Sequence, residues 1–277
     1  PSSWGNGITL INVLPMEDYL KGVVPSEIVP SWRMDAIKAQ AVAARTYATY
    51  HRNGYRSSGY DVTDDTRTQV YRGFSAETAA TNRAVSETAG EVVTYAGKPI
   101  DALFHSSGGG FTENSENVWG SVIPYLRGVK EESSTYLMTP WKKTMTMASF
   151  TKSLENAGYK IGDLKSIKLS HLKKGEANHS SDRGISGRVK SVVFVGKKGR
   201  ATVSGERLQR LYGLDSTLFD ISAKGKELTI TGYGYGHGLG LSQWGAEAMA
   251  EKHGDGKNYY KTILSHYFTG TKIEKIY

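Results

Sequence analysis

A helix that is apolar nearly all round constrains this chain more than any other feature of its sequence. The residue pattern predicts it over Ser31–Tyr50, with Ser31 as the N-cap and alanine at six of the following positions. A helix without a broad polar face is a buried helix, so other segments must pack around it on several sides. The sequence therefore predicts a folded core that contains this helix.

Two cations interrupt that helix. Lys38 and Arg45 are seven residues apart and fall on one stripe with Val42 and Thr49. Because an unpaired charge is very costly to bury, each cation must reach a carboxylate, a groove or the surface. The stripe is either a narrow solvated strip or a cationic wall that faces an anionic ligand, and the spacing leaves both interpretations open.

The composition of the 277 residues fits a folded protein, with 38% hydrophobic and 22% charged residues, and the length suits one large domain or two small ones. Lysine and arginine (35) outnumber aspartate and glutamate (27), and the net charge of +8 favours an anionic partner. No window approaches the roughly 18 apolar residues of a membrane span. The absence of cysteine excludes disulfides, thiolate zinc sites and cysteine nucleophiles. A chain that begins with Pro1 is expected to be a mature or trimmed piece.

Strands and helices follow one another without regular βαβ alternation, which predicts an α+β fold. Residues 141–220 are more basic than the rest and are expected to form an inserted or second lobe within one domain over residues 1–277. Pro25 and Pro30 are expected to bracket a non-helical link. The expected strands lie at residues 8–14, 91–95, 100–106, 189–195 and 227–231. The other expected helices lie at residues 15–20, 75–88, 206–212, 241–252 and 259–267.

One carboxylate stands in an apolar segment. Glu27 lies in the stretch Val23–Pro30, among four aliphatic residues and two prolines. If the aliphatic side chains pack around it, desolvation raises its pKa, as a general acid at neutral pH requires. The alternative is a carboxylate that points into solvent or supports the first turn of the next helix.

A histidine and two hydroxyls follow an expected strand. His105, Ser106 and Ser107 precede three consecutive glycines, which free the backbone for the close approach of a ligand. A lone histidine at this position is either structural or catalytic.

Alternating glycines mark residues 232–245, which read GYGYGHGLGLSQWG. As a strand, the run would present one bare face and project Tyr233, Tyr235, His237 and Leu239 from the other, which suits the floor of a ligand site. The alternative is a structural run that leads into a helix. The glycines lack the register of a dinucleotide fingerprint, no G-K-[ST] follows, and the serine is not in a nucleophile elbow.

Aromatic side chains adjoin these segments. Trp32, Trp119 and Trp244 each lie beside one of them, and the chain has 17 tyrosines and five tryptophans. Flat aromatic faces suit the apolar faces of sugar rings and equally suit stacked bases, so they leave the partner open.

Three of these segments together resemble the signatures of the stage II sporulation protein D family, which includes the LytB amidase enhancers. They are LKGVVPSEIVPSWRMDAIKAQAVAARTY (20–47), FHSSGGGFTENSENVWG (104–120) followed by Pro124–Leu126, and GYGHGLGLSQWGA (234–246). Weaker matches at Asp61–Tyr71 and Ser186–Arg188 extend the resemblance over nearly the whole chain. Three motifs in the right order are specific, although none would be alone.

The resemblance implies a bacterial cell-wall protein of mixed α/β structure with a cleft, secreted or anchored outside the cytoplasm. Sporulation members of the family are lytic transglycosylases. They cut peptidoglycan glycan between N-acetylmuramic acid and N-acetylglucosamine, leave a 1,6-anhydro end and prefer strands without stem peptides. The LytB members are described as enhancing a separate amidase. Some clostridial members bind zinc through a histidine and two cysteines, which this chain lacks, and no metal or other cofactor is expected.

Position by position, the resemblance places the family's catalytic glutamate at Glu27. The residues it places at substrate-binding positions are Lys38, Arg45, His105, Ser106, Ser107, His237 and Gln243.

A single carboxylate suffices for the implied reaction, because the 6-hydroxyl of the sugar replaces water as the nucleophile. Cations beside Glu27 would lower its pKa, so we expect Lys38 and Arg45 to face the lactyl carboxylate of the muramic acid and not to pair with Glu27. Asp64 and Asp65 are the reserve carboxylates for a hydrolase, which normally needs two.

The expected partner is the glycan strand of peptidoglycan. In the alternative function the chain binds peptidoglycan without cutting it and enhances a partner N-acetylmuramoyl-L-alanine amidase. A nucleic-acid partner is supported only by the net charge and the aromatic residues, and is not expected.

Overall fold

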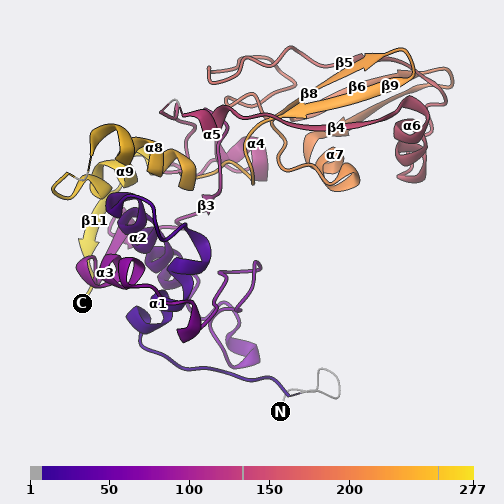
Figure 1. Ribbon diagram of the computed structural model, residues 1–277. Helices are drawn as coiled ribbons and strands as arrows, with labels where there is room; N and C mark the ends of the chain where they lie inside the picture. Colours follow the sequence, from indigo (N-terminus) through magenta and orange to yellow (C-terminus); the bar gives the residue numbers. More distant parts are fainter. Residues whose placement is uncertain (1–7, 133, 255) are drawn as a thin grey trace. The chain divides into compact units, whose positions relative to one another are not determined.

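The computed structural model describes residues 8–132, 134–254 and 256–277, and Figure 1 shows its helices and strands. Helices mix with several small sheets, so the expected α+β fold is confirmed. The chain divides into two compact units: residues up to Leu103 together with Met249–Tyr277, and Phe104–Ala248. The expected single domain with a lobe at 141–220 stays a prediction. In the described part of the chain, no helix is both long and apolar enough to cross a membrane.

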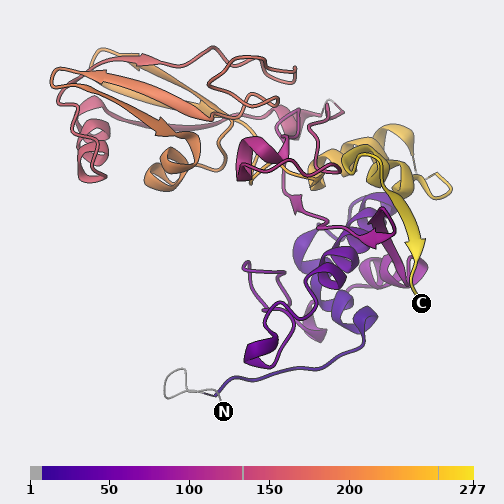
Figure 2. The same cartoon turned by 180° about the vertical axis from the view of Figure 1, so that it is seen from behind.

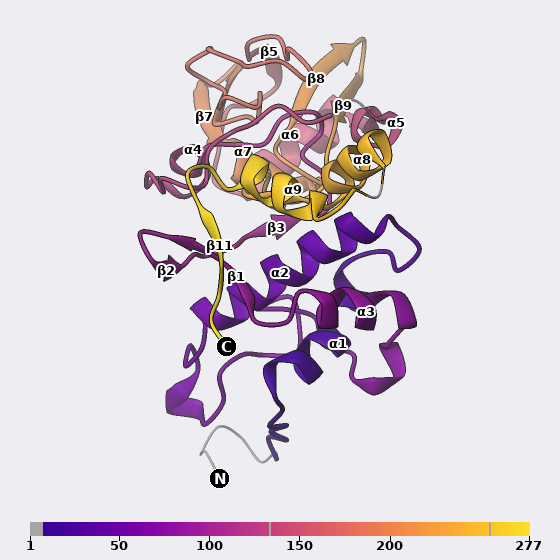
Figure 3. The ribbon, with the colours of Figure 1, turned by 90° about the vertical axis from the view of Figure 1, so that its left-hand side faces the viewer.

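Helix α2 (Met34–Tyr50) lies in the core of the first unit, as its composition predicts. All six of its alanines are buried, and such small side chains let the neighbouring elements approach closely. Figure 3 shows α1 and α3 beside it. The elements that pack against α2 are α1 (Met16–Glu27), α3 (Ala79–Glu87), α9 (Tyr259–Tyr267) and strand β1 (Glu91–Tyr95).

Two helices begin later than expected. The N–H of Trp32 bonds to the carbonyl of Val29 at 3.1 Å, so this segment forms a turn of its own before α2 starts. Helix α3 starts after Thr78, whose Oγ1 accepts the N–H of Thr81 at 3.2 Å as an N-cap.

The predicted non-helical link at Pro25 is wrong, because α1 continues through this proline to Glu27. A proline inside a helix removes one backbone hydrogen bond. The apolar residues on either side compensate: Val24 and Ile28 are buried, and the N–H of Ile28 still reaches the carbonyl of Val24 at 3.0 Å. Burial of the helix therefore outweighs the local cost of the proline, and it places Glu27 at the end of a helix.

The predicted strand at residues 8–14 is also wrong. No strand pairing includes this segment in the part of the chain that the structure describes, and Ile8, Leu10 and Val13 are each at least 87% exposed. β-branched residues favour an extended backbone, but a strand also needs a partner to satisfy its hydrogen bonds.

A three-stranded antiparallel sheet completes the first unit, in the order β11-β1-β2. β1 and β2 (Lys98–Pro99) form a hairpin, and Ala96 and Gly97 between them have φ of 50° and 74°, as a tight hairpin turn requires. The strand expected at residues 100–106 is wrong for most of its length, because only residues 104 and 105 are in a strand. Strand β11 (Lys272–Lys275) was not predicted, because its charged residues lack a hydrophobic pattern.

The second unit contains a lobe of two antiparallel sheets that share one core. Figures 1 and 2 show helices α6 and α7 on the same side of the strands. One sheet is ordered β4-β9-β8 and the other β5-β6-β7. The elements are β4 (Trp141–Thr146), α6 (Met147–Asn156), β5 (Leu164–Lys168), β6 (Ser191–Gly196), β7 (Arg200–Ser204), α7 (Gly205–Tyr212), β8 (Phe219–Lys224) and β9 (Glu227–Gly232).

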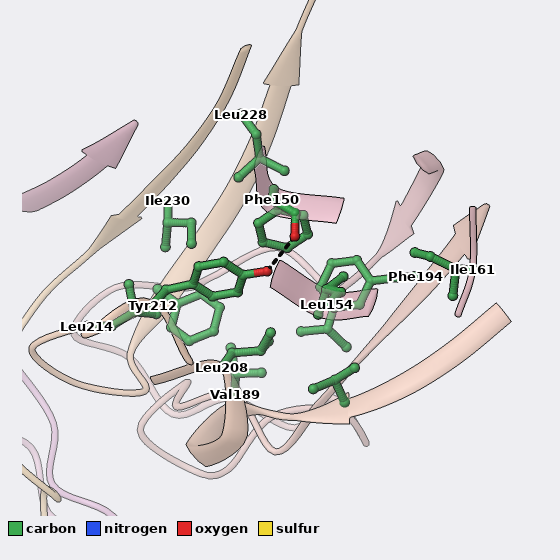
Figure 4. Close-up of a cluster of buried hydrophobic side chains, with 13 residues drawn as sticks. Phe150, Leu154, Ile161, Val189, Phe194, Leu208, Tyr212, Leu214, Leu228 and Ile230 are labelled. Carbon is green, nitrogen blue, oxygen red and sulfur yellow. Dashed lines mark hydrogen bonds between the residues drawn. The ribbon is translucent and has the colours of Figure 1, made fainter. Parts of the chain in front are cut away.

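Figure 4 shows the core of this lobe. Phe150 of α6 stacks on Tyr212 of α7, with ring centres 4.7 Å apart, and contacts Phe194 of β6. The hydroxyl of Tyr212 donates to the carbonyl of Phe150 at 2.9 Å, so the phenol is satisfied within the apolar core.

Short elements connect the motif segments of the second unit. Strand β3 (Phe104–His105) pairs in parallel with β10 (Leu241–Ser242), which joins the second family motif to the third. Helices α4 (Ser115–Trp119) and α5 (Thr135–Met138) also belong to this unit, and α8 (Gln243–His253) begins in it. The first unit also has two short 3₁₀ helices, Arg56–Ser58 and Phe74–Ala76.

Candidate functional site

Glu27 is the last residue of α1, where two effects favour its protonated form. Burial raises the pKa of Glu27 above its usual 4.5, and the neighbouring Val23, Val24 and Ile28 are at most 5% exposed. The C-terminal end of a helix carries partial negative charge, which also disfavours a carboxylate. The expected desolvation is confirmed, although Val29 is 44% exposed and lies outside the buried cluster.

A loop over residues 61–72 holds Glu27. The backbone N–H of Val70 donates to Glu27 Oε1 at 2.9 Å, a bond that lowers the pKa against the larger effect of burial. The loop is tied to α1 because the N–H of Arg72 bonds to the carbonyl of Gly22 at 3.2 Å. Sequence reasoning noted this loop only as a weak family match, since a backbone donor leaves no signal in the side-chain pattern.

Two phenols lie close enough to Glu27 to sense its charge. Burial, followed by the charge of Glu27, raises the pKa of Tyr19, and burial raises the pKa of Tyr47 to about 12 with a smaller contribution from Glu27. The hydroxyl of Tyr19 is 3.2 Å from Oε1 of Gln69, a fully buried residue whose Nε2 donates to the carbonyl of Ala44 at 3.2 Å. Glu27 therefore lies near two neutral phenols on a fixed scaffold.

The expectation that Arg45 faces a ligand is wrong. Its guanidinium is fully buried and all five N–H groups have partners inside the unit. Nε and Nη2 bind the carboxylate of Glu17 at 2.9 and 2.7 Å, and the remaining N–H groups reach Thr88 and the carbonyls of Val85 and Glu91. A groove would need donors that Arg45 no longer has. The spacing of the stripe could not reveal Glu17, because this partner comes from another helix.

Lys38 forms an ion pair with Glu87, and its ammonium lies 5.7 Å from the centre of the Tyr260 ring. Hydrogen bonds from Lys38 and then from Arg83 lower the pKa of Glu87 to about 2. Lys38 pairs with Glu87 and Arg45 pairs with Glu17. Neither cation pairs with Glu27, and this part of the expectation is confirmed. The side chain of Lys38 is only 15% exposed. Its contact with a ligand stays a prediction.

In the second unit, the rings of His105 and His237 lie 5.4 Å apart. The Nδ1 of His105 bonds to the carbonyl of Leu239 at 3.1 Å and must carry the hydrogen, because a carbonyl only accepts. Burial, with the charges of His237 and Arg188, holds the pKa of His105 well below 6.5, so the ring is neutral. Its buried Nε2 has no hydrogen-bond partner among the described residues.

Both ring nitrogens of His237 are engaged by the backbone. Nε2 donates to the carbonyl of Phe104 at 3.1 Å, and Nδ1 accepts the N–H of Leu239 at 3.0 Å. A proton transfer at His237 would break one of these bonds. A ligand would therefore contact the face of the ring and not its nitrogens. Trp119, which is 49% exposed, lies 6.1 Å away between ring centres. The two rings could flank a sugar, and this role stays a prediction.

The polar side chains of the second and third motifs meet beside β3 and β10. Ser107 exchanges two backbone hydrogen bonds with Tyr235, at 3.1 and 2.9 Å, and its buried Oγ has no partner within the described residues. The carbonyl of Ser106 accepts the N–H of Trp244 at 3.0 Å, next to the buried Gln243. The structure thus gathers these residues in one place, and their contacts with glycan stay predictions.

Residues 233–240 of the glycine run are not a strand, so the prediction of one bare face is wrong. The four alternate glycines from Gly234 to Gly240 have φ between 67° and 98°, a left-handed backbone that residues with a Cβ rarely adopt. The side chains between them do not share one face: Leu239 is fully buried and Tyr235 is 60% exposed. Alternation here comes from backbone turns and not from a pleat.

Gly238 is also required by Arg188, which occupies the space of a side chain. A Cβ on Gly238 would lie 2.3 Å from the guanidinium carbon. Arg188 is 2% exposed and donates from Nη1 to the carbonyl of Gly108 at 3.1 Å, while Glu113 and Glu131 supply opposite charge nearby. Arg188 therefore holds the glycines of the second motif against those of the third.

Two buried glutamates in this region were missed. Glu113 accepts the N–H of Ile185 at 2.9 Å and the hydroxyl of Ser186 at 2.6 Å, and Glu131 accepts the N–H of Gly110 at 2.7 Å. Burial raises the pKa of Glu131. Both stand in polar stretches of sequence, so nothing local marks them as buried. Both carboxylates hold neighbouring loops through these hydrogen bonds, and we interpret both as structural residues.

The reserve carboxylate Asp65 is bound by Arg67, whose Nε lies 3.0 Å from both oxygens. This contact lowers the pKa of Asp65 to about 2, so the group is ionised at neutral pH and cannot donate a proton. Among residues 8–132, 134–254 and 256–277, no group of three or more histidine, aspartate or glutamate side chains could hold a metal ion.

A family model described as Stage II sporulation protein matches residues 5–95, which include Glu27 and α2. The chain is 34% identical over 282 residues to Stage II sporulation protein D of Bacillus subtilis, a match that covers 95% of this chain and 75% of that protein. This chain belongs to the stage II sporulation protein D family.

One further family model matches the second unit, and two further proteins are similar to most of the chain. A model described as Domain of unknown function (DUF8618) matches residues 112–240. An uncharacterized protein of Brachyspira hyodysenteriae is 34% identical over 272 residues, covering 98% of this chain and 69% of that protein. The Amidase enhancer of Bacillus subtilis is 33% identical over 294 residues, covering 92% of this chain and 40% of that protein. Sporulation proteins and an enhancer thus share one family with this chain.

Proposed function

We propose that this chain is a lytic transglycosylase of the bacterial cell wall, with Glu27 as its acid and base. The substrate is the bond between N-acetylmuramic acid and N-acetylglucosamine in peptidoglycan glycan, and the product carries a 1,6-anhydro end. The chain acts outside the cytoplasm, in contact with the wall, and the reaction needs no cofactor.

The observation that carries this proposal is the raised pKa of Glu27. A general acid must hold its proton near the pH at which it works. Burial and the end of α1 both favour the protonated form, and the N–H of Val70 fixes one carboxyl oxygen at 2.9 Å. The nearby phenols of Tyr19 and Tyr47 stay neutral, so they offer hydrogen bonds to sugar hydroxyls without changing the charge of the site.

The reaction needs two proton transfers, both at Glu27. The protonated carboxyl donates to the oxygen that links the sugars, and the bond from this oxygen to C1 of the muramic acid breaks. The carboxylate then accepts the proton of the 6-hydroxyl as its oxygen bonds to C1. Atoms balance without water, and Glu27 ends protonated, ready for the next cycle. Acid–base assistance of this kind is worth about 10²–10⁴-fold in rate.

The experiment compares Glu27→Gln with the unaltered chain on purified glycan strands, with mass spectrometry of anhydro products as the readout. Glu251→Gln, at an exposed residue of α8, makes the same chemical change elsewhere and is the matched control. We expect Glu27→Gln to lose cleavage and keep binding to the strands, and Glu251→Gln to keep both. Full activity of Glu27→Gln would rule out the proposed role.

A second function is favoured by the similarity to the Amidase enhancer. In this alternative the chain binds peptidoglycan, cuts nothing, and activates a partner N-acetylmuramoyl-L-alanine amidase. Incubating the chain alone with peptidoglycan separates the two functions: anhydro ends indicate the enzyme. Intact strands, together with a faster release of stem peptides when an amidase is added, indicate the enhancer.

A further inference from the structure

One face of the lobe in the second unit is left uncovered by helices. α6 and α7 lie on the same side of the strands, where the core side chains gather. Directly opposed residues of antiparallel strands share a face, so the strand register identifies the other side of β5-β6-β7. We call it the open face. Its polar residues are Ser166, Lys168, Ser191, Arg200, Thr202 and Ser204.

A hollow of about 430 Å³ lies at one end of the open face. Leu169 and Val193 supply apolar surface, Ser170 and Ser191 supply hydroxyls, and Asp182 supplies a carboxylate. A second hollow of about 290 Å³ adjoins it at Leu169. An apolar floor with a few hydroxyls and a carboxylate matches a sugar ring, which has an apolar face and a hydroxyl rim.

Asp182 contributes a fixed carboxylate to the lining of this hollow. Its Oδ2 accepts the backbone N–H of Ser170 at 2.7 Å, which fixes the carboxylate. Burial would raise the pKa of Asp182, but hydrogen bonds from the backbone and the side chain of Ser170 lower it overall. The hollow is therefore lined by a carboxylate, which can accept a hydrogen bond from a sugar hydroxyl.

The positive charge of the chain is concentrated in this lobe. Residues 141–232, which form this lobe, contain 18 lysine and arginine residues and eight acidic residues, a net charge of +10, whereas the rest of the chain has 17 and 19, a net charge of −2. The net basicity of the protein therefore resides in the segment that carries the open face. Lys168 and Arg200 are exposed there, on strands at opposite edges of the sheet. Their Cα atoms are about 12 Å apart by strand geometry, far enough to pair with two different anionic groups.

We propose that the open face is a docking surface for a glycan strand whose sugars carry free carboxylates. Sugar hydroxyls bond to the serine and threonine hydroxyls and to Asp182, and the carboxylates pair with Lys168 and Arg200. The proposal rests on the proposed function only in taking glycan as the substrate. It assigns a holding role to the second unit, which is separate from the chemistry at Glu27.

The test measures binding of peptide-free glycan strands, in which removal of the stem peptide leaves a lactyl carboxylate on each muramic acid. Measurements use the full chain with Glu27→Gln, so that the proposed cleavage does not shorten the probe. Lys168→Glu with Arg200→Glu is expected to weaken binding roughly tenfold at low salt, and Asp182→Asn to weaken it severalfold. Circular dichroism checks that each variant is folded.

The matched control is Lys152→Glu with Arg207→Glu, which makes the same charge change on α6 and α7. Both residues are exposed, and they belong to the helices on the covered side. We expect the control to bind within twofold of the parent. Equal weakening by both pairs would overturn the proposal, since net charge alone would then explain it. Tighter binding of polyphosphate than of the glycan would overturn it as well, in favour of a phosphate polymer.

The two proposals fail in different ways. If Glu27→Gln abolishes cleavage while the open-face variants bind glycan normally, the docking surface is wrong and the proposed function stands. If the open-face variants lose binding while Glu27→Gln still cuts, the docking surface stands and the role of Glu27 is wrong.

Discussion

The two ends of α1 carry one glutamate each, and the fold treats them in opposite ways. Burial alone would raise the pKa of Glu17, but hydrogen bonds from Arg45 and Tyr277 and the charge of Arg45 lower it overall. Burial also acts on Glu27, where the N–H of Val70 opposes it only in part and the pKa is raised. The helix dipole adds to both effects, since it favours a carboxylate in the first turn and disfavours one in the last. The same residue type thus becomes an ion-paired carboxylate at one end and a buried carboxyl group with a raised pKa at the other.

Neutralising each of the two glutamates in turn should have the largest effect. Glu27→Gln is expected to lower the cleavage rate by about 10²–10⁴-fold, with little loss of folding stability because burial already disfavours the charged form of this group. Glu17→Gln is expected to leave the cleavage rate nearly unchanged and to lower the folding stability, because the charge of Arg45 loses its partner. Initial rates and urea unfolding of both variants give the answer. The assignment of roles would be refuted if Glu17→Gln lost the cleavage rate and Glu27→Gln lost the folding stability.

Removing the cation that holds Glu17 should have the next largest effect. Arg45→Met leaves a half-buried carboxylate without its ion pair and is expected to lower the free energy of unfolding by about 3–5 kcal/mol. Urea denaturation measures this loss. If Arg45 instead lined a groove, the variant would fold normally and bind glycan less tightly.

Glu17 and Arg45 show what sequence can and cannot predict here. The burial of α2 and the desolvation of Glu27 follow from local composition, and both were predicted. The role of Arg45 was not, because its partners come from α1, α3 and β1 and only the fold brings them together. Pro25 was misjudged for a related reason: burial of Val24 and Ile28 keeps α1 helical where the local preference would end it.

The glycine run illustrates a second limit. Its alternation matches the period of a strand, but the same spacing also arises when every second residue has a positive φ. The packing of Arg188 on Gly238 requires the second conformation there, and Arg188 lies in a different segment of the sequence. The backbone donor at Val70 is hidden in the same way, since side-chain patterns carry no record of it.

Glu27 depends on a scaffold, and Gln69 is its buried member. Gln69→Ala leaves the carbonyl of Ala44 and the hydroxyl of Tyr19 without this partner, which is expected to cost about 1–3 kcal/mol in the free energy of unfolding. Because Val70 is the next residue, the cleavage rate should fall as well. Gln209→Ala, at a partly exposed residue of α7, is the control and should change the stability by no more than about 0.5 kcal/mol. Equal effects of both variants would separate Gln69 from the site.

The pH dependence of stability should also differ in sign between the two ends. Glu17 has a lowered pKa, so its contribution is present above pH 4.5 and is lost as the pH falls through its folded pKa. Glu27 has a raised pKa, so its contribution is complete below pH 4.5 and is lost as the pH rises through its folded pKa. Relative to the parent, Glu27→Gln should therefore become more stable as the pH rises above 4.5, and Glu17→Gln should lose its deficit as the pH falls below that value. Urea unfolding over a pH series measures both, and parallel curves would mean that neither pKa is shifted.

The smallest effect is expected at Asp65, and it decides the reaction class. With a pKa of about 2 and a bond to Arg67, this carboxylate holds no proton at neutral pH and can serve only as a base. The proposed transglycosylase reaction does not need that base, because in it Glu27 accepts the proton of the 6-hydroxyl. Asp65→Asn should therefore cut glycan within about twofold of the parent, with anhydro ends retained in the mass spectrum. A large loss of activity, together with reducing ends in the parent's products, would instead assign the second carboxylate of a hydrolase to Asp65 and make water the nucleophile.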